Sequence, residues 1–279
     1  MAQEILQFSN QDRVMAGALT LPDRGDSGVG FVLCRPFGAE AIRSHAMFRA
    51  LATRLARAGC ATLVFDYHGT GESPGDAATQ DLAHWQRDIV AADAFLRYRT
   101  GVARTHWFGL GLGATLAARA ALAAPAAARP AHLVLWDPVE NGSDYVALMF
   151  ARHRREMERW FRSRWDVIRR DGLEDEPSLP GVVLGFEVGS GLAADFGRLQ
   201  TLQLQSLIDA GIRVTIGRDR AATAALPSSP LLRVRTIEQK INWMTNHAPE
   251  GEEYEGSAIV PQDAVAAAQE SLHVVELAA

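Results

Sequence analysis

Short apolar runs alternate with longer amphipathic segments along most of this chain. Runs typical of β-strands occur at residues 4–9, 13–20, 29–34, 61–65, 105–109, 132–136, 213–216 and 231–237. Segments that favour helices occur at residues 42–58, 81–98, 114–124, 145–170, 196–210 and 261–272. Strands that alternate with helices indicate right-handed crossovers. The pattern therefore predicts an α/β fold with a mostly parallel eight-stranded sheet flanked by helices.

Residues 145–170 interrupt this rhythm with a long helical stretch that is crowded with arginine. One interpretation is a surface helix: Trp160, Phe161 and Trp165 supply an apolar stripe while the arginines face water. The other is a basic lid that meets an acidic partner, such as an acyl-carrier protein or an anionic group of a ligand. We favour the first. We predict a single domain, residues 1–279, with residues 145–180 as a helical cap insertion.

Composition narrows the class of protein further. The chain has 279 residues, of which 48% are apolar and 22% charged, and it contains two cysteines. These values exclude a disordered chain and a disulfide-stapled miniprotein. The formal net charge of −5 argues against a nucleic-acid binder. The N-terminus has no signal-peptide pattern, and no run of 18 apolar residues occurs. We expect a soluble cytoplasmic protein with no membrane partner.

Two glycine-containing turns follow strands in this pattern. Residues 66–73 read Asp-Tyr-His-Gly-Thr-Gly-Glu-Ser, and residues 109–113 read Gly-Leu-Gly-Leu-Gly between a strand and a helix. The second turn presents its central residue, Gly111, at the helix N-terminus. An alternative for this turn is a dinucleotide-binding loop, but it comes late in the chain rather than after the first strand. We therefore expect no nucleotide and no other cofactor or metal.

The two turns resemble those of the α/β-hydrolase superfamily. Residues 66–73 resemble its D-x-x-G-x-G-x-S turn, and residues 109–113 resemble its nucleophile elbow, G-x-S-x-G. More narrowly, residues 34–40, 43–45 and 135–139 resemble a bacterial subgroup of serine aminopeptidase-like or exosortase-system-associated hydrolases, some of which accompany biosynthetic clusters. The resemblance implies the α/β-hydrolase fold and a site at the carboxyl edge of the sheet.

Glycine stands where the resemblance leads one to expect the nucleophilic serine. Gly111 has no side chain and cannot form an acyl-enzyme. Some members of the subgroup also lack serine at this position. Cys34 is a conceivable replacement nucleophile beside Arg35, but its place at the end of an apolar strand favours packing.

Several polar side chains remain as candidates for acid–base chemistry. Asp219 and His247 follow late strands in the order that the family uses for its acid and base. Asp219 also stands between Arg218 and Arg220, and we favour a surface ion pair with these arginines. Asp137 ends a strand at the edge where α/β ligand sites lie, or it caps the next turn. Glu40 is a further catalytic candidate in the segment after the third strand.

The remaining pocket candidates follow from the same resemblance. In the family, the loop after the third strand supplies one N–H of the oxyanion hole, which here is Phe37 or Gly38. The second donor would be the N–H of Leu112. His45 begins the next helix near this loop. His68 either lines the pocket or caps its own turn.

Three functions are compatible with this set of residues. The first is an enzyme that acts on an acyl, ester or thioester substrate in a biosynthetic pathway, without a serine nucleophile. The second is a non-catalytic pseudo-hydrolase that binds an acyl ligand or a partner protein. The third is a lyase or cyclase whose substrate is protected from hydrolysis.

Overall fold

A mixed β-sheet forms the centre of the molecule in the computed structural model, which describes residues 2–22, 25–168, 181–219, 225–238, 241–244 and 260–273. Its strands are β1 (Ala2–Asn10), β2 (Arg13–Leu21), β3 (Val29–Cys34), β4 (Ala61–Phe65), β5 (Arg104–Leu110), β6 (His132–Trp136), β9 (Arg213–Arg218) and β10 (Leu232–Thr236). The eight strands have the order β1-β2-β4-β3-β5-β6-β9-β10. β2 is antiparallel to β1 and β4, and all other neighbours are parallel. The predicted fold class is confirmed.

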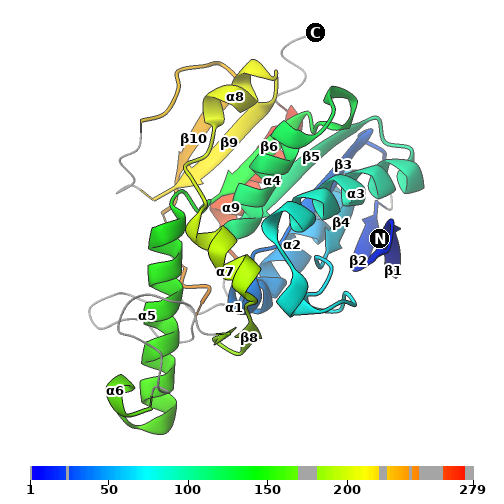
Figure 1. The fold of residues 1–279 in the computed structure, drawn as a ribbon. Helices are drawn as coiled ribbons and strands as arrows, with labels where there is room; N and C mark the ends of the chain where they lie inside the picture. Colours follow the sequence, from blue (N-terminus) through cyan, green and yellow to red (C-terminus); the bar gives the residue numbers. More distant parts are fainter. Residues whose placement is uncertain are drawn as a thin grey trace.

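Helices cover both faces of this sheet (Figure 1). They are α1 (Gly38–Arg43), α2 (His45–Arg57), α3 (Leu82–Thr100), α4 (Leu112–Ala123), α5 (Gly142–Phe161), α6 (Trp165–Ile168), α7 (Ser190–Gly197), α8 (Leu204–Asp209) and α9 (Gln262–His273). Short 3₁₀ turns lie at Ala77–Thr79 and Ala126–Ala128, and β7 (Val182–Val183) pairs with β8 (Phe186–Glu187).

Two apolar cores explain why β3 and β6 are buried along their whole length. On one face, α2 and α9 pack against alternate strand residues such as Phe31 and Val134. On the other face, α3, α4 and α8 pack against the intervening residues, such as Val32 and Leu133. Side chains of a strand alternate between faces, so a strand covered on both faces reads as a continuous apolar run.

Three predicted helices differ from the structure in their boundaries. The helix predicted at 42–58 is two helices, α1 and α2, which meet at Ser44, and α1 begins earlier, at Gly38. The helix predicted at 145–170 starts at Gly142 and ends at Phe161, because Arg162 turns into the left-handed region at φ +49°. That expectation also reaches residues 169–170, which lie outside the described residues.

The helix predicted at 196–210 is wrong as a single element. The chain forms the end of α7 and then α8, with residues 198–203 between them. The apolar spacing correctly indicated buried positions, which are Phe196, Leu199, Leu204 and Leu207. The helix nevertheless breaks after Gly197, and the Leu199 carbonyl accepts a hydrogen bond from the Gly142 N–H (2.9 Å) at the start of α5.

The segment between β6 and β9 carries helices away from the sheet. Figure 1 shows α5 extending beyond the carboxyl edge of the sheet, with α6 at its far end. Asn141 caps α5, because its Oδ1 accepts hydrogen bonds from the N–H groups of Ser143 (2.9 Å) and Asp144 (3.2 Å).

Among the described helices, none is both long and apolar enough to cross a bilayer.

Candidate active site

The turn between β5 and α4 has the shape of a nucleophile elbow. Gly111 adopts φ +55° and ψ −124°, and its N–H donates to the Trp136 carbonyl at 2.9 Å. On either side the backbone approaches too closely for a side chain. A Cβ at Gly109 would lie 2.4 Å from the Ala114 Cα, and a Cβ at Gly113 would lie 2.4 Å from the Arg35 oxygen. Glycine is therefore required at both flanks to bring strand and helix together.

The space in front of Gly111 faces a carboxylate. A Cβ built on Gly111 would lie 3.9 Å from Oε1 and 4.0 Å from Oε2 of Glu40, which α1 positions. The hydroxyl of Tyr145, near the start of α5, donates to Glu40 Oε2 at 3.0 Å. Glu40 and Tyr145 share a pocket with apolar side chains, including those of Phe37, Met149 and Phe186. The elbow thus presents its empty central position to an acidic group.

Burial changes the acid strength of this carboxyl. Removal from water raises the pKa of Glu40 from 4.5 to about 7, the hydrogen bond from Tyr145 opposes this, and the negative charge of Asp137 adds to it. The pKa of Tyr145 also rises well above its ordinary value, through burial and the neighbouring Glu40. A carboxyl with a pKa near 7 exchanges protons readily at neutral pH, which is the property of a general acid–base group.

Two backbone N–H groups flank the same space. The segment after β3 lies against the elbow, since the Pro36 Cβ is 3.7 Å from a Cβ built on Gly111. Within the described ranges, the N–H groups of Phe37 and Leu112 have no hydrogen-bond acceptor. Leu112 is the first residue of α4, where an N–H is free of the helical ladder. Such groups can stabilise a developing oxyanion.

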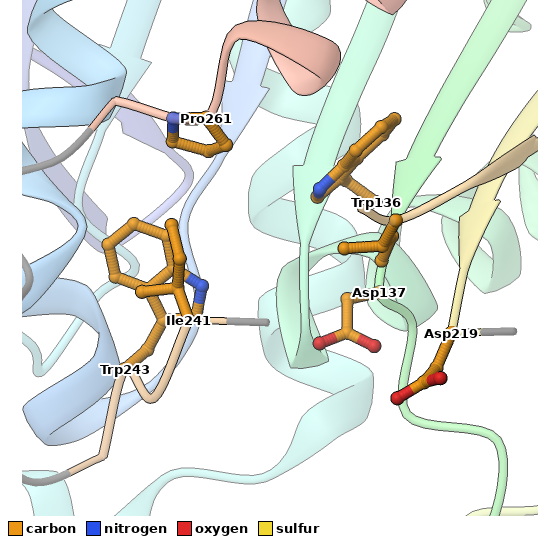
Figure 2. Close-up of a pocket in the computed structure, with 7 residues that line it drawn as sticks. Trp136, Asp137, Asp219, Ile241, Trp243 and Pro261 are labelled. Atoms are coloured by element: carbon orange, nitrogen blue, oxygen red, sulfur yellow. The ribbon is translucent and has the colours of Figure 1, made fainter. Parts of the chain in front are cut away.

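A second group of side chains lies at the ends of β6 and β9. Asp137 and Asp219 line a small pocket together with Trp136, Trp243 and Ile241 (Figure 2). Asp137 has φ +48°, and its N–H donates to the Gly217 carbonyl at 2.9 Å. The structure thus brings both predicted aspartates to one pocket. His247, the predicted base, lies outside the described residues.

Known proteins share this architecture. The model of the S33 serine aminopeptidase family matches residues 41–172. Proline iminopeptidase from Mycobacterium smegmatis superposes with a TM-score of 0.60 at 14% identity, over 99% of both chains. The esterase Est1E from Butyrivibrio proteoclasticus, solved with bound ferulic acid, gives 0.55 at 17% identity, over 83% of this chain and 88% of its own. The chain therefore has the α/β-hydrolase fold.

At these sequence identities, the likeness to the solved structures is one of fold. XC6422 from Xanthomonas campestris, a serine hydrolase without a lid, matches at 22% identity and a TM-score of 0.42. That match spans 49% of this chain and 61% of XC6422. The search of curated proteins found no sequence relative of this chain.

Other candidate residues from the sequence lie away from the elbow. His45 is exposed at the first residue of α2. His68 remains in its own turn, where its Nδ1 lies 2.9 Å from the Val14 oxygen and its ring contacts Gly75. Of the two alternatives for His68, these contacts support a role in its own turn rather than in the pocket. Cys34 is fully buried, and burial raises the pKa of its thiol strongly, so it packs rather than reacts.

The turn of residues 66–73 has a structural role. Asp66 forms an ion pair with Arg35 and accepts the N–H of Glu72 at 3.0 Å. Ser73 accepts the N–H of Ala16 at 2.8 Å and donates to the Asp66 carbonyl at 2.6 Å. These bonds fasten the turn to β2 and hold the segment after β3 in place beside the elbow.

Sequence reasoning did not identify Tyr145 as a site residue. Its signal is a stripe of Tyr145, Met149 and His153 at four-residue spacing within the arginine-rich helix. All three are buried, so the stripe marks the face of α5 that meets the body of the protein. Tyr145 is the first residue of this stripe, and its hydroxyl donates to Glu40.

Proposed function

We infer that this protein acts on the carbonyl group of an acyl, ester or thioester substrate, with Glu40 in place of a serine-centred mechanism. The observation that carries the proposal is the position of Glu40. Its carboxyl oxygens lie 3.9 and 4.0 Å from where a side chain at Gly111 would begin, and its pKa is about 7. The resemblance to a subgroup that accompanies biosynthetic clusters supports a biosynthetic role.

The proposed reaction needs only a water molecule and groups of this chain. The substrate carbonyl oxygen accepts hydrogen bonds from the N–H groups of Phe37 and Leu112. The Glu40 carboxylate takes a proton from water, whose oxygen adds to the carbonyl carbon. When the tetrahedral intermediate collapses, the protonated Glu40 returns the proton to the departing oxygen or sulfur. Tyr145 keeps the carboxylate oriented throughout.

Loss of the nucleophile has a chemical consequence that supports this route. Without a serine at Gly111, no acyl-enzyme forms, and the acyl group stays on its carrier until water or a group of the substrate attacks. If a hydroxyl or acidic carbon of the substrate replaces water as the proton donor to Glu40, the same site performs a cyclisation or elimination. The nature of the product distinguishes these reactions.

A binding role is the second candidate, and Gly111 itself favours it. Apolar side chains of Phe37, Met149 and Phe186 lie beside Glu40, but they leave little free volume, so they would have to move apart to admit an acyl chain. In that case the protein would copurify with an acyl ligand, which native mass spectrometry would detect, and Glu40→Gln would leave the ligand in place.

The test compares Glu40→Gln with Glu72→Gln, which alters an exposed carboxyl in a surface turn. Hydrolysis of p-nitrophenyl esters and N-acetylcysteamine thioesters is measured over a range of pH. We expect kcat/KM of the wild type to rise towards a plateau above about pH 7. The kcat/KM of Glu40→Gln should be about 10²–10⁴-fold lower, the range typical of losing a general base, while that of Glu72→Gln should be unchanged. Absence of turnover in the wild type, or equal turnover in both variants, would overturn the proposal.

A further inference from the structure

The far end of the α5–α6 hairpin exposes a group of large apolar side chains. Trp160, Phe161 and Val167, here called the hairpin tip, have exposed fractions of 77%, 64% and 71%. Other exposed apolar residues of the described chain, such as Ile5 and Tyr98, lie singly on different elements. Single exposed residues are ordinary, but a cluster on a projecting element indicates a contact surface.

The hairpin is held in a fixed shape that keeps the tip outside. Trp165 turns inward and is 5% exposed, with its ring centroid 5.8 Å from that of Phe150 and 5.9 Å from that of His153. The backbone N–H of Trp165 donates to Glu158 Oε1 at 2.9 Å. One tryptophan of the hairpin is thus packed against α5, whereas Trp160 projects from the same hairpin into solvent.

Cations adjoin the tip. Arg155 and Arg159 are four residues apart on one side of the last turns of α5, and Arg162 is the left-handed residue that ends this helix. All three are exposed, and none has an ion-pair partner in the described part of the chain. By contrast, Arg164 pairs with Asp166 at 2.9 Å.

We propose that the hairpin tip binds the surface of an anionic lipid bilayer. Tryptophan and phenylalanine side chains partition into the interfacial layer, while arginine is attracted to lipid phosphates. The formal net charge of −5 opposes any general attraction of the protein to such a surface. Binding therefore depends on the apolar side chains of the hairpin tip and the arginines beside it. The proposal concerns surface attachment, and it revises the sequence-based expectation of no membrane partner.

The shape of the tip favours lipid over an acidic protein. A stable protein–protein interface buries about 800 Å² on each partner, usually with packed side chains at its centre. The tip is the end of one projecting hairpin (Figure 1), which suits shallow insertion between headgroups better than a broad interface. Insertion would also orient the carboxyl edge of the sheet, from which α5 projects, towards the membrane.

The test is co-sedimentation with vesicles of phosphatidylcholine alone and of phosphatidylcholine mixed with phosphatidylglycerol. We expect the wild type to bind the mixed vesicles, and added salt to weaken this binding. The triple variant Arg155→Gln/Arg159→Gln/Arg162→Gln should lose roughly a hundredfold in partitioning, because each arginine near an anionic surface contributes about fivefold. Trp160→Gln/Phe161→Gln should also release the protein.

The matched control replaces three exposed arginines elsewhere, Arg49→Gln/Arg57→Gln/Arg87→Gln on α2 and α3. It changes the net charge equally and should retain binding. Circular dichroism and urea unfolding show that each variant is folded. Equal binding to both vesicle types, equal loss in the control triple variant, or no binding by the wild type would overturn the proposal. Retention by a polyglutamate resin with no vesicle binding would assign the arginines to an acidic protein instead.

Discussion

Replacing Glu40 with glutamine should stabilise the protein at alkaline pH. The carboxyl has a pKa of about 7 in the folded chain, against an ordinary value of 4.5, mainly because it is buried. A pKa difference of one between the folded and unfolded chain corresponds to about 1.4 kcal/mol, so the ionised carboxylate costs the native state at most about 3 kcal/mol. Glutamine keeps the shape and can still accept the hydrogen bond from Tyr145, but it carries no charge.

The sign of the effect follows from proton binding. Between about pH 4.5 and 7 the folded protein holds the Glu40 proton while the unfolded chain has released it, so this group makes the protein less stable as pH rises. Above about pH 7 both states are ionised and the cost is constant. The stability advantage of Glu40→Gln should therefore grow from near zero at about pH 4.5 to its full value at about pH 8.

Urea unfolding of the wild type and Glu40→Gln at several pH values measures this difference. Glu72→Gln serves as the control, because its exposed side chain should give no pH-dependent difference. A difference between wild type and Glu40→Gln that is constant from about pH 5 to pH 8, or that grows towards acid, would refute the raised pKa. The proposal that Glu40 exchanges protons at neutral pH would fall with it.

Three further outcomes follow from the same structure. Tyr145→Phe removes the hydrogen bond that lowers the pKa of Glu40, so the midpoint of the pH–rate profile should move above about 7. Gly111→Ser should fold, since the nearest atom to its Cβ is 3.7 Å away, but φ +55° should cost about 1–3 kcal/mol in urea unfolding. Burial lowers the pKa values of His106 and His132 from 6.5 to about 3 and about 4. The two histidines should therefore lower stability below about pH 6.5, contributing a slope that approaches about 2.7 kcal/mol per pH unit near about pH 5. This slope is measured in Glu40→Gln, where the opposite contribution of Glu40 is absent, and a flat slope there would contradict the prediction.

The strands were predictable because their patterns depend on local burial. Each predicted strand lies within one or two residues of its observed bounds, and β3, β4 and β6 agree completely. A strand between two helical layers must be apolar throughout, so its sequence carries the signal. Helix ends were less predictable, since distant contacts decide them. The break after Gly197 depends on the bond between Leu199 and the start of α5, which is 57 residues earlier in the chain.

The elbow was predictable for a similar reason, whereas its chemistry was only partly so. Close backbone contacts require glycine at positions 109 and 113, and these two glycines are the flanking residues of the recognisable G-x-x-x-G pattern of the elbow. The sequence named Glu40, Asp137 and Asp219 as candidates. It could not show that α1 begins at Gly38, which turns Glu40 towards Gly111, or that Tyr145 reaches across from α5. Those facts depend on side chains that meet from separate elements.

The elbow and Glu40 carry different weight as signs of function. Glycine adopts φ +55° without strain, so the elbow at Gly111 no longer needs a catalytic reason to persist. The same explanation does not apply to a buried carboxyl, because glutamine at position 40 would keep its hydrogen bond and avoid the cost of ionisation. Buried ionisable side chains that lower stability, at positions where a neutral side chain of the same shape would fit, are concentrated at functional sites. The argument for chemistry at this site therefore depends on Glu40 rather than on the elbow, and the pH dependence of stability is the measurement that tests it first.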